Sequence, residues 1–263
     1  MYILHYFVKI CYNFTTIHTL LQAGFKYIIL NESTTIRRRM IIMSTTYPVG
    51  NATKHKILTQ SKLLFHQKGY AATTYTDIST SANVNRALIP YHFQSKPILG
   101  KAVFQEILTQ THMTLDTILD MSQFSADFAG MLHLMSFYYL LQDNIFATFC
   151  TQVLADDSNA LFDHAVEQAE LLSLSKKLSS ISDEELSLLT HMHIGIKQQM
   201  IQYLANHTDT DLKTIAKMHL ALLLSYIGQS RKKCDELIDA ACEVLDMLSF
   251  QIDDTFTVTV RFR

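Results

Sequence analysis

The run of residues 53–104 constrains the fold more than any other part of the chain, because it reads as four successive helices with tight connections. Gly69 is the residue type that ends a helix in a left-handed conformation. Thr74 and Ser95 are suited to cap the second and fourth helices. Between them, Asn83 stands where a tight turn needs a positive φ, which Asn tolerates better than most residues. The pattern predicts a helix–turn–helix.

Each element of this run carries its own local signal. The residues that give the first helix one buried face, at helical spacing, are Ile57, Leu58, Ser61, Leu64 and Phe65. Thr74 followed by Asp77 forms a capping box at the start of the second helix. Asn85 is placed to cap the third helix, expected over Asn85–Tyr91, and Pro97 lies in the first turn of the fourth. The third helix is therefore the predicted recognition helix, the element that enters the major groove of DNA.

Charge is distributed unevenly along the chain. Residues 44–101, the head, hold seven Lys or Arg against one acidic residue, Asp77, for a net charge of +6. Residues 102–263 hold ten basic and 22 acidic residues, for −12, and residues 1–43 hold five basic and one acidic residue. The overall charge of −2 thus hides a cationic head on an anionic body. A cationic head is the electrostatic pattern of a module that binds phosphate.

The head resembles the DNA-binding domain of the TetR (tetracycline-repressor) family of bacterial transcription regulators. The matching residues are Ile57-Leu58, Leu64-Phe65, Gly69-Tyr70, Thr73-Thr74, Asp77-Ile78, Ala82-x-Val84, Tyr91-His92-Phe93 and Ser95-Lys96. The resemblance implies a repressor that binds a palindromic operator in double-stranded DNA as a homodimer and is released by a small-molecule effector. It also implies a cytoplasmic, nucleoid-associated bacterial protein that needs no cofactor.

The resemblance implies which residues contact DNA. Those expected to hold a phosphate at the start of the second helix are Thr74, Tyr75 and Thr76. Those expected to face base edges are Asn85, Arg86, Ala87 and Leu88, with Arg86 best suited to read guanine through two hydrogen bonds. Those expected to touch the DNA backbone are Tyr91, His92 and Lys96.

The head departs from the family pattern at three positions. Asn83 stands where the family usually has Gly, Ala87 also often replaces a Gly, and Pro90 stands where Tyr or Asn is common. Proline removes a helical N–H, so we expect a short recognition helix with a loosened last turn and weakened base contacts from Leu88 onward. Pro90 thereby keeps open an alternative, a helical protein-interaction module whose head no longer reads DNA.

The rest of the chain predicts an all-α body. Only 7 Gly and 3 Pro occur, while 48% of residues are hydrophobic, which favours long helices. The expected helices are Pro97 to about Asp120, Ser125–Leu141, Asn144–Leu154, Ser158–Ser179, Asp183–Ala205, Asp209–Gly228 and Arg231–Phe250. Length and pattern together predict a helix–turn–helix DNA-binding domain at residues 44–101 and a larger helical effector-binding and dimerisation domain at 102–250.

Two of these helices are candidates for a subunit interface. Apolar residues wrap most of the helix between Leu212 and Ile227, which predicts a helix buried all round. A helix at a dimer interface explains this better than burial within one subunit. The resemblance implies a four-helix bundle formed by Asp183–Ala205 and Asp209–Gly228 from each subunit. Charged residues such as Lys213 interrupt the apolar run and argue against a membrane span.

The resemblance further implies an effector cavity in the body. Candidate lining residues, each also suited to an ordinary core, are Phe104, Leu108, His112, Phe128, Met131, Met135, Tyr138, Phe149, Cys150, Phe162, His191, Met192 and Met200. Of these, His112, Tyr138 and His191 are favoured, because a buried polar group needs a partner.

Metal and catalytic functions are disfavoured. His191-x-His193 places two imidazoles about 200° apart on a helix, so they do not converge. The four cysteines are scattered, and Cys234 and Cys242 lie eight residues apart on one helix, where they cannot form a disulfide. This usage suits a reducing cytosol. Phosphate-loop, dinucleotide, serine-hydrolase and zinc-protease motifs are absent, so we expect neither a metal site nor an enzyme.

The two ends differ from the helical remainder. Residues 1–30 are rich in aromatic and β-branched residues but lack the pattern of a signal peptide. We expect residues 1–43 to be an extension, either untranslated or disordered, and removal of residues 1–42 to leave folding and operator binding nearly intact. Phe256, Val258, Val260 and Phe262 alternate with polar residues, so residues 251–263 are expected to form a strand or stay disordered. A lone strand exposes its edge, and if the N-terminal segment packs as real structure, its aromatic and β-branched residues are the expected partner.

Overall fold

The computed structural model describes residues 25–26, 43–44, 48–207 and 210–263. The chain divides into two compact units, Met1–Ile57 and Leu58–Arg263. In the first unit β1 (Phe25–Lys26) pairs antiparallel with β2 (Met43–Ser44). The expectations for the rest of residues 1–43 lie outside the described residues. Helix α2 (Pro48–Lys68) begins in the first unit and continues into the second.

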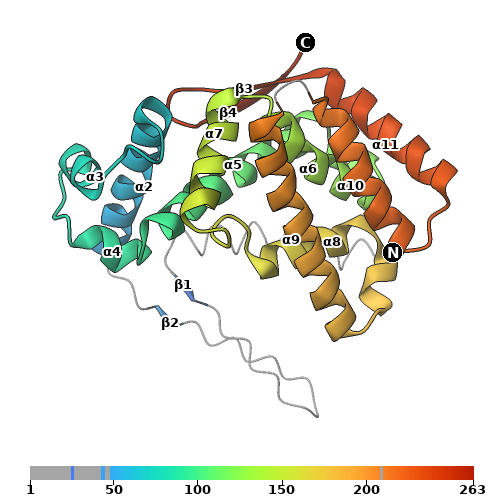
Figure 1. The fold of residues 1–263 in the computed structure, drawn as a ribbon, viewed down its shortest axis with the longest axis horizontal. Helices are drawn as coiled ribbons and strands as arrows, with labels where there is room; N and C mark the ends of the chain where they lie inside the picture. The colour runs from blue at the N-terminus through green and yellow to red at the C-terminus, as the bar shows by residue number, and fades with distance from the viewer. Residues whose placement is uncertain (1–24, 27–42, 45–47, 208–209) are drawn as a thin grey trace. The chain divides into compact units, whose positions relative to one another are not determined.

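The helix–turn–helix follows α2. Gly69 ends α2 with φ of +82°, and α3 (Tyr75–Ala82) begins with the predicted capping box of Thr74 and Asp77. Asn83 adopts φ of 50°, the left-handed conformation predicted for the turn. Helix α4 (Leu88–Phe93) corresponds to the predicted recognition helix, and Ser95 caps α5 (Lys96–Ile118), which continues into the body (Figure 1).

The recognition helix begins three residues later than predicted. Asn85 does not cap it directly; its Oδ1 accepts from the Ala87 N–H at 2.9 Å, which holds a turn ahead of the helix. Because α4 starts at Leu88, Pro90 lies in its first turn, where an N–H is unpaired anyway. The helix is short, as predicted, but Pro90 does not loosen its last turn. The carbonyl of Pro90 instead accepts from the Gln94 N–H at 2.8 Å and closes the helix.

The helices of the body are α6 (Ala126–Leu140), α7 (Asn144–Asp156), α8 (His164–Leu174), α9 (Asp183–Asn206), α10 (Leu212–Tyr226) and α11 (Arg231–Asp246), with short 3₁₀ turns η1 (Met121–Gln123) and η2 (Lys176–Ser180). The helix predicted over Ser158–Ser179 is wrong at both ends. Asp163 caps α8 through the Ala165 and Val166 N–H groups, and Ser175 starts the separate turn η2.

Helix α6 forms the centre of the body core and contacts α5, α8, α10 and α11 (Figure 1). Its residues from Gly130 to Leu140 are buried apart from the half-buried His133. Gly130 allows α8 to approach closely, because a Cβ there would lie 2.8 Å from the carbonyl oxygen of Ser173. Around α6, Phe104 packs its ring against Phe137 and Phe162. The apolar volume is thus already occupied by large side chains.

The chain ends in a β-hairpin rather than in helix. Helix α11 ends at Asp246 instead of the predicted Phe250, and β3 (Leu248–Ile252) pairs antiparallel with β4 (Val258–Phe262). The predicted strand therefore exists, and it pairs with the segment directly before it, a partner that was not predicted. Buried Val258 and Val260 face the body, where β4 packs on α5. Among the described residues, no helix is long and apolar enough to cross a membrane.

Candidate nucleic-acid interface and buried polar network

The recognition helix presents a small exposed face. Ile89 is 0% and Phe93 3% exposed, and these two side chains anchor α4 in the head. Arg86 and Ala87, in the turn that precedes the helix, are exposed, and Tyr91 is 78% exposed. An exposed guanidinium beside a small residue fits a surface that approaches base edges. Of the other residues expected at DNA, Asn85 and Thr76 are exposed, while Leu88, Tyr75 and His92 are half-buried.

Thr74, expected to contact phosphate, is exposed and uses its hydroxyl in the capping box of α3. Its Oγ1 accepts from the Asp77 N–H at 3.1 Å and donates to the Asp77 carboxylate at 2.8 Å. That carboxylate also takes the ammonium of Lys68 at 2.8 Å, and these contacts hold the pKa of Asp77 well below its usual range. Lys68 thus offsets an acidic charge at the helix start that would otherwise repel phosphate.

Lys96 is likewise engaged within the head. Its Nζ donates to the carbonyl of Ala71 at 3.3 Å and lies 4.4 Å from the centroid of the Tyr70 ring. Partial burial lowers the pKa of Lys96, although nearby Asp156 opposes the shift. The side chain that was expected to touch the DNA backbone therefore also fixes the loop between α2 and α3.

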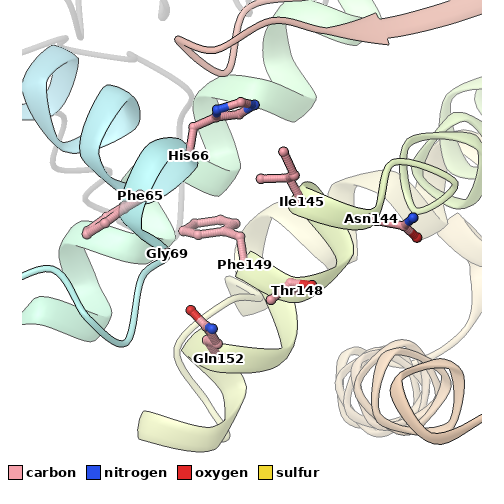
Figure 2. Close-up of a pocket in the computed structure, with 8 residues that line it drawn as sticks. All are labelled: Phe65, His66, Gly69, Asn144, Ile145, Thr148, Phe149 and Gln152. Carbon is pink, nitrogen blue, oxygen red and sulfur yellow. The ribbon is translucent and has the colours of Figure 1, made fainter.

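A groove of about 270 Å³ lies where α2 meets α7 (Figure 2). Its lining residues are Phe65, His66, Gly69, Asn144, Ile145, Thr148, Phe149 and Gln152. Two hydrogen bonds join head and body beside it: Gln152 Oε1 accepts from the Ala71 N–H at 2.9 Å, and the Tyr70 hydroxyl donates to Asp156 at 2.6 Å. Of the expected effector-pocket residues, Phe149 lines this groove.

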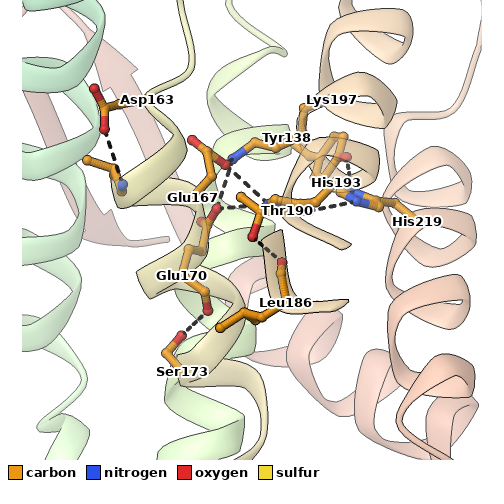
Figure 3. A network of polar contacts seen from close by, with 11 residues as sticks. Tyr138, Asp163, Glu167, Glu170, Ser173, Leu186, Thr190, His193, Lys197 and His219 are labelled. Atoms are coloured by element: carbon orange, nitrogen blue, oxygen red, sulfur yellow. Dashed lines mark hydrogen bonds and ion pairs between the residues drawn. The ribbon is translucent and has the colours of Figure 1, made fainter. Parts of the chain in front are cut away.

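A chain of polar side chains crosses the body core from α6 to α8 (Figure 3). The Tyr138 hydroxyl lies 2.6 Å from His219 Nδ1, and His219 Nε2 lies 3.0 Å from His193 Nδ1. His193 Nε2 lies 3.2 Å from the carboxylates of both Glu167 and Glu170. His193 and His219 are both fully buried, so these hydrogen bonds replace the water that the side chains lose on folding.

Lys197 completes the network with a buried charge. Its Nζ lies 2.8 Å from Glu167 and 2.9 Å from Glu170, and its side chain is 1% exposed. Burial opposes the charged forms, but the opposite charges outweigh it: they raise the pKa of Lys197 and hold that of Glu170 well below its usual range. Burial, together with His193 and Lys197, lowers the pKa of His219 well below its usual value, so that imidazole is neutral.

Three members of this network have the geometry of a metal site. One ligand atom from each of Glu167, Glu170 and His193 lies within 4.8 Å of the others. The Lys197 ammonium, however, contacts both carboxylates at hydrogen-bond distance and occupies the place of a cation. A metal ion bound to the same oxygens would meet that positive charge. The arrangement therefore suits an internal ion pair better than a metal ion.

The structure separates the predicted effector-pocket residues into groups. The side chains buried in the body are Phe104, Met131, Met135, Tyr138, Phe149, Cys150 and Phe162. Those half-buried are Leu108, His112, Phe128 and Met200. The exposed ones, His191 and Met192, lie on the outer face of α9 and do not line the interior. Tyr138 is the expected residue that joins the polar network; the Nε2 of His112 is covered and has no hydrogen-bond partner among the described residues.

Glu167, Glu170, His193, Lys197 and His219 were not expected as site residues. Helical spacing carries part of the signal: Glu167 and Glu170 are three apart, and His193 and Lys197 are four apart, so each pair shares one helical face. The opposite orientation of His191 and His193 was predicted correctly, since the first is exposed and the second fully buried. The five network residues come from three helices, and no local sequence pattern predicts that they meet.

Exposed apolar side chains gather on α9 and α10. On α10, Met218, Leu222 and Tyr226 follow at four-residue spacing and are 58%, 60% and 48% exposed. Large apolar residues of α9 with similar exposure are Leu188, Met192 and Tyr203. The composition of α10 predicted a helix buried on all sides, and this prediction is wrong for the single chain. One face of α10 packs on α6 and α11, and another exposes a stripe of apolar side chains.

Comparison with known proteins gives the head a family. A family model described as bacterial regulatory proteins, tetR family, matches residues 57–103. IcaR, the negative transcriptional regulator of the biofilm operon icaADBC in Staphylococcus aureus (strain Newman), is 33% identical over 76 residues, which cover 29% of this chain and 39% of IcaR. The probable transcriptional regulator YttP of Bacillus subtilis (strain 168) is 38% identical over 66 residues, 25% of this chain and 32% of YttP. The matches thus span less than half of these relatives.

The similarity in fold extends into the body. The crystal structure of RolR in complex with its ligand resorcinol superposes with a TM-score of 0.52 and covers 72% of this chain and 94% of RolR. The two sequences are 18% identical in this alignment. The head and the helical body therefore share one known architecture.

Proposed function

Because the chain belongs to the TetR family of bacterial transcription regulators, we propose that it represses transcription by binding a palindromic DNA operator as a homodimer, and that a small molecule releases it. The observation that carries this proposal is the exposed surface formed by Arg86 and Ala87, in the turn before α4, and by Tyr91 on α4, a helix anchored by Ile89 and Phe93. A firmly held helix with a cationic side chain at its start is suited to reading the major groove. Its site of action is then the bacterial cytoplasm, on the nucleoid.

The exposed apolar stripe of α10 supports the homodimer. Isolated apolar side chains are common on protein surfaces, but a stripe on α10 together with one on α9 suits burial against another subunit. The Tyr226 hydroxyl donates to Glu185 at 2.6 Å and joins the end of α10 to the start of α9. Two-fold pairing of this surface presents two recognition helices to one palindrome.

The buried polar network supports an effector site in the body. Tyr138 on α6, His193 on α9 and His219 on α10 are hydrogen-bonding groups between helices, and two of these helices, α9 and α10, also carry the exposed apolar side chains. A small molecule that exchanges hydrogen bonds with these groups has to separate α6, α9 and α10, because the intact core is filled. RolR, which shares the fold, was crystallised with the small phenol resorcinol. A small hydroxylated molecule is therefore our first choice of effector.

The alternative function, a helical protein-interaction module that does not read DNA, is not supported by the position of Pro90. Pro90 was the feature that favoured it, and Pro90 lies in the first turn of α4, where the missing N–H is harmless. The assignment to a family of transcription regulators agrees with the expectation that the chain is not an enzyme.

Selection from a random DNA library tests the proposal. The full-length protein should enrich a palindromic sequence, and binding should weaken steeply with added salt, because Lys and Arg release counterions from phosphate. Light scattering on the same sample should give two chains per operator. Enrichment of no sequence over several rounds, or binding of a monomer to a single half-site, would contradict the proposal.

A further inference from the structure

The turn of the C-terminal hairpin is held rigidly by one carboxylate. Asp253 Oδ1 accepts from the N–H groups of Thr255 at 2.8 Å and Thr257 at 2.9 Å. The backbone closes the same turn, since the Asp253 N–H donates to the carbonyl of Thr257 and the Phe256 N–H to the carbonyl of Asp253, both at 3.0 Å. This arrangement leaves Phe256 with a φ of 53°.

Phe256 is an unusual residue for that conformation. A bulky side chain at positive φ is strained, and glycine is the residue type that adopts it freely. Such strain persists only where surrounding contacts over-determine it. Here the compensating contact is the burial of the ring, which is 0% exposed. The hairpin thus ends in a buried aromatic side chain rather than in the small polar residues typical of turns.

The ring of Phe256 lies where the head meets the body. Its centroid is 5.2 Å from that of His66 on α2, and also 5.2 Å from that of Phe149 on α7. Phe149 in turn stacks on Phe65 at 5.8 Å and contacts Tyr70 at 6.2 Å. Figure 2 shows the Phe149 ring directed toward α2, close to Phe65 and His66. Three segments far apart in sequence therefore share one aromatic cluster.

The base of the hairpin is fixed to the body. Phe250 on β3 packs on Tyr139 of α6 with ring centroids 5.6 Å apart. Arg263 closes the open end, because its N–H donates to the carbonyl of Met247 at 2.9 Å and its Nε to that of Leu248 at 3.1 Å. A strand pair held at its base and along α5 can transmit the position of the body to whatever its tip contacts.

We propose that the C-terminal hairpin is a positioning element for the DNA-binding head, with Phe256 as the residue that fixes the last turns of α2 against α7. The inference rests on the proposed DNA binding for its consequence, the distance between paired recognition helices, but not for the contact itself. The hydrogen bonds from Tyr70 and Ala71 to α7 join head and body at two single contacts, about which the head could rotate. The ring of Phe256, packed between α2 and α7, restricts that rotation.

Spin-label distances test the positioning without DNA. In full-length protein with Cys11→Ser, labels at the exposed sites Thr80→Cys on α3 and Glu243→Cys on α11 report the head–body distance, with labelled chains diluted in unlabelled protein. We expect a narrow distribution for the parent protein. Phe256→Gly, which removes the ring and the strain together, should broaden it. Phe256→Tyr should keep it narrow, and Asp254→Ala, on the exposed part of the same turn, should leave it unchanged.

A second variant guards against loss of the hairpin itself. His66→Ala removes the head-side ring and leaves the hairpin intact, so it should broaden the same distribution. An unchanged width in both Phe256→Gly and His66→Ala would overturn the inference, even if thermal stability fell. With DNA, Phe256→Gly should lose roughly fivefold or more of the preference for native over shifted half-site spacing. Failure of the parent protein to bind DNA would refute the proposed function alone, since the distance measurement still decides the positioning.

Discussion

The head and the body place polar chemistry in opposite settings. In the head, the cap of α3 is made by Thr74 and Asp77, three residues apart, and the side chains proposed to contact DNA point to solvent. In the body, Tyr138, Glu167, Lys197 and His219 come from four helices and meet away from water. Local sequence signals therefore specify the head, whereas the body depends on contacts between distant segments. The two regions should respond differently to substitution, in size and in pH dependence.

The largest effect is expected when the buried ion pair loses its cation. Lys197→Ala leaves Glu167 and Glu170 as buried, uncompensated carboxylates, and should lower the free energy of unfolding by roughly 3–5 kcal/mol. The matched control is Lys213→Ala, whose ammonium pairs with Asp246 at 2.6 Å but is 37% exposed. Such a surface pair contributes about 0–1 kcal/mol. Urea unfolding measures both, and equal losses would show that burial does not set the value of the network.

A charge on the apolar stripe should dissociate the dimer. Leu222 on α10 is 60% exposed in the single chain, whereas the neighbouring Leu223 is 6% exposed and packs inward. Leu222→Glu should raise the dimer dissociation constant by about 100-fold, which corresponds to about 2.7 kcal/mol. The chain itself should stay folded, unlike in Leu223→Glu. Sedimentation gives the oligomeric state and circular dichroism the fold; a dimer that tolerates Leu222→Glu would place the interface elsewhere.

Acid should destabilise the body because the folded state keeps His112 neutral. Burial, with His133 nearby, lowers the pKa of His112 to about 3, against 6.5 for the free side chain. Between these values the unfolded chain takes up a proton that the folded chain refuses, so stability falls as the pH drops from 6.5 toward 3. His112→Phe should flatten this slope. His191→Phe, at an exposed position of α9, should not, and equal slopes in the two variants would refute the assignment.

The smallest stability effect is expected in the head. Thr74→Ala removes the hydroxyl that caps α3 and should cost about 1 kcal/mol of unfolding free energy. Thr76→Ala, at an exposed position in the first turn of α3, is the matched control and should cost less. Thermal unfolding compares the two. If the control costs as much as the cap variant, the capping box contributes nothing of its own, and the head is less locally encoded than we infer.

The parts of the fold that sequence predicted are those with local causes. The left-handed Asn83 and the caps at Thr74 and Ser95 depend on one residue and its immediate neighbours, and they were predicted correctly. The start of α4 was misplaced because Asn85 forms a turn instead of a cap, two hydrogen-bond patterns that the same side chain supports. The start of α8 was also misplaced, because the carboxylate of Asp163 caps the helix at His164.

The body site could be predicted only in part, because its members meet through tertiary packing. Tyr138 was expected as a polar pocket residue. Lys197 was not, because only the packing of α9 against α8 brings it to Glu170. The C-terminal strand was predicted from its alternation, whereas its partner was not. The turn at Asp253 folds β4 back onto β3 and depends on local residues. Recognition of this turn in the sequence would have predicted β3 as the partner of β4.

The most direct test of the account is the base preference of Arg86→Ala on the operator selected by the parent protein. Binding to operator variants, one base pair changed at a time, should show that the substitution costs roughly 1–3 kcal/mol and removes discrimination at a single position in each half-site. Lys96→Ala, in the same assay, should weaken binding to all sequences alike. Unchanged discrimination at every position in Arg86→Ala would contradict the proposal that the start of α4 and the turn before it read DNA.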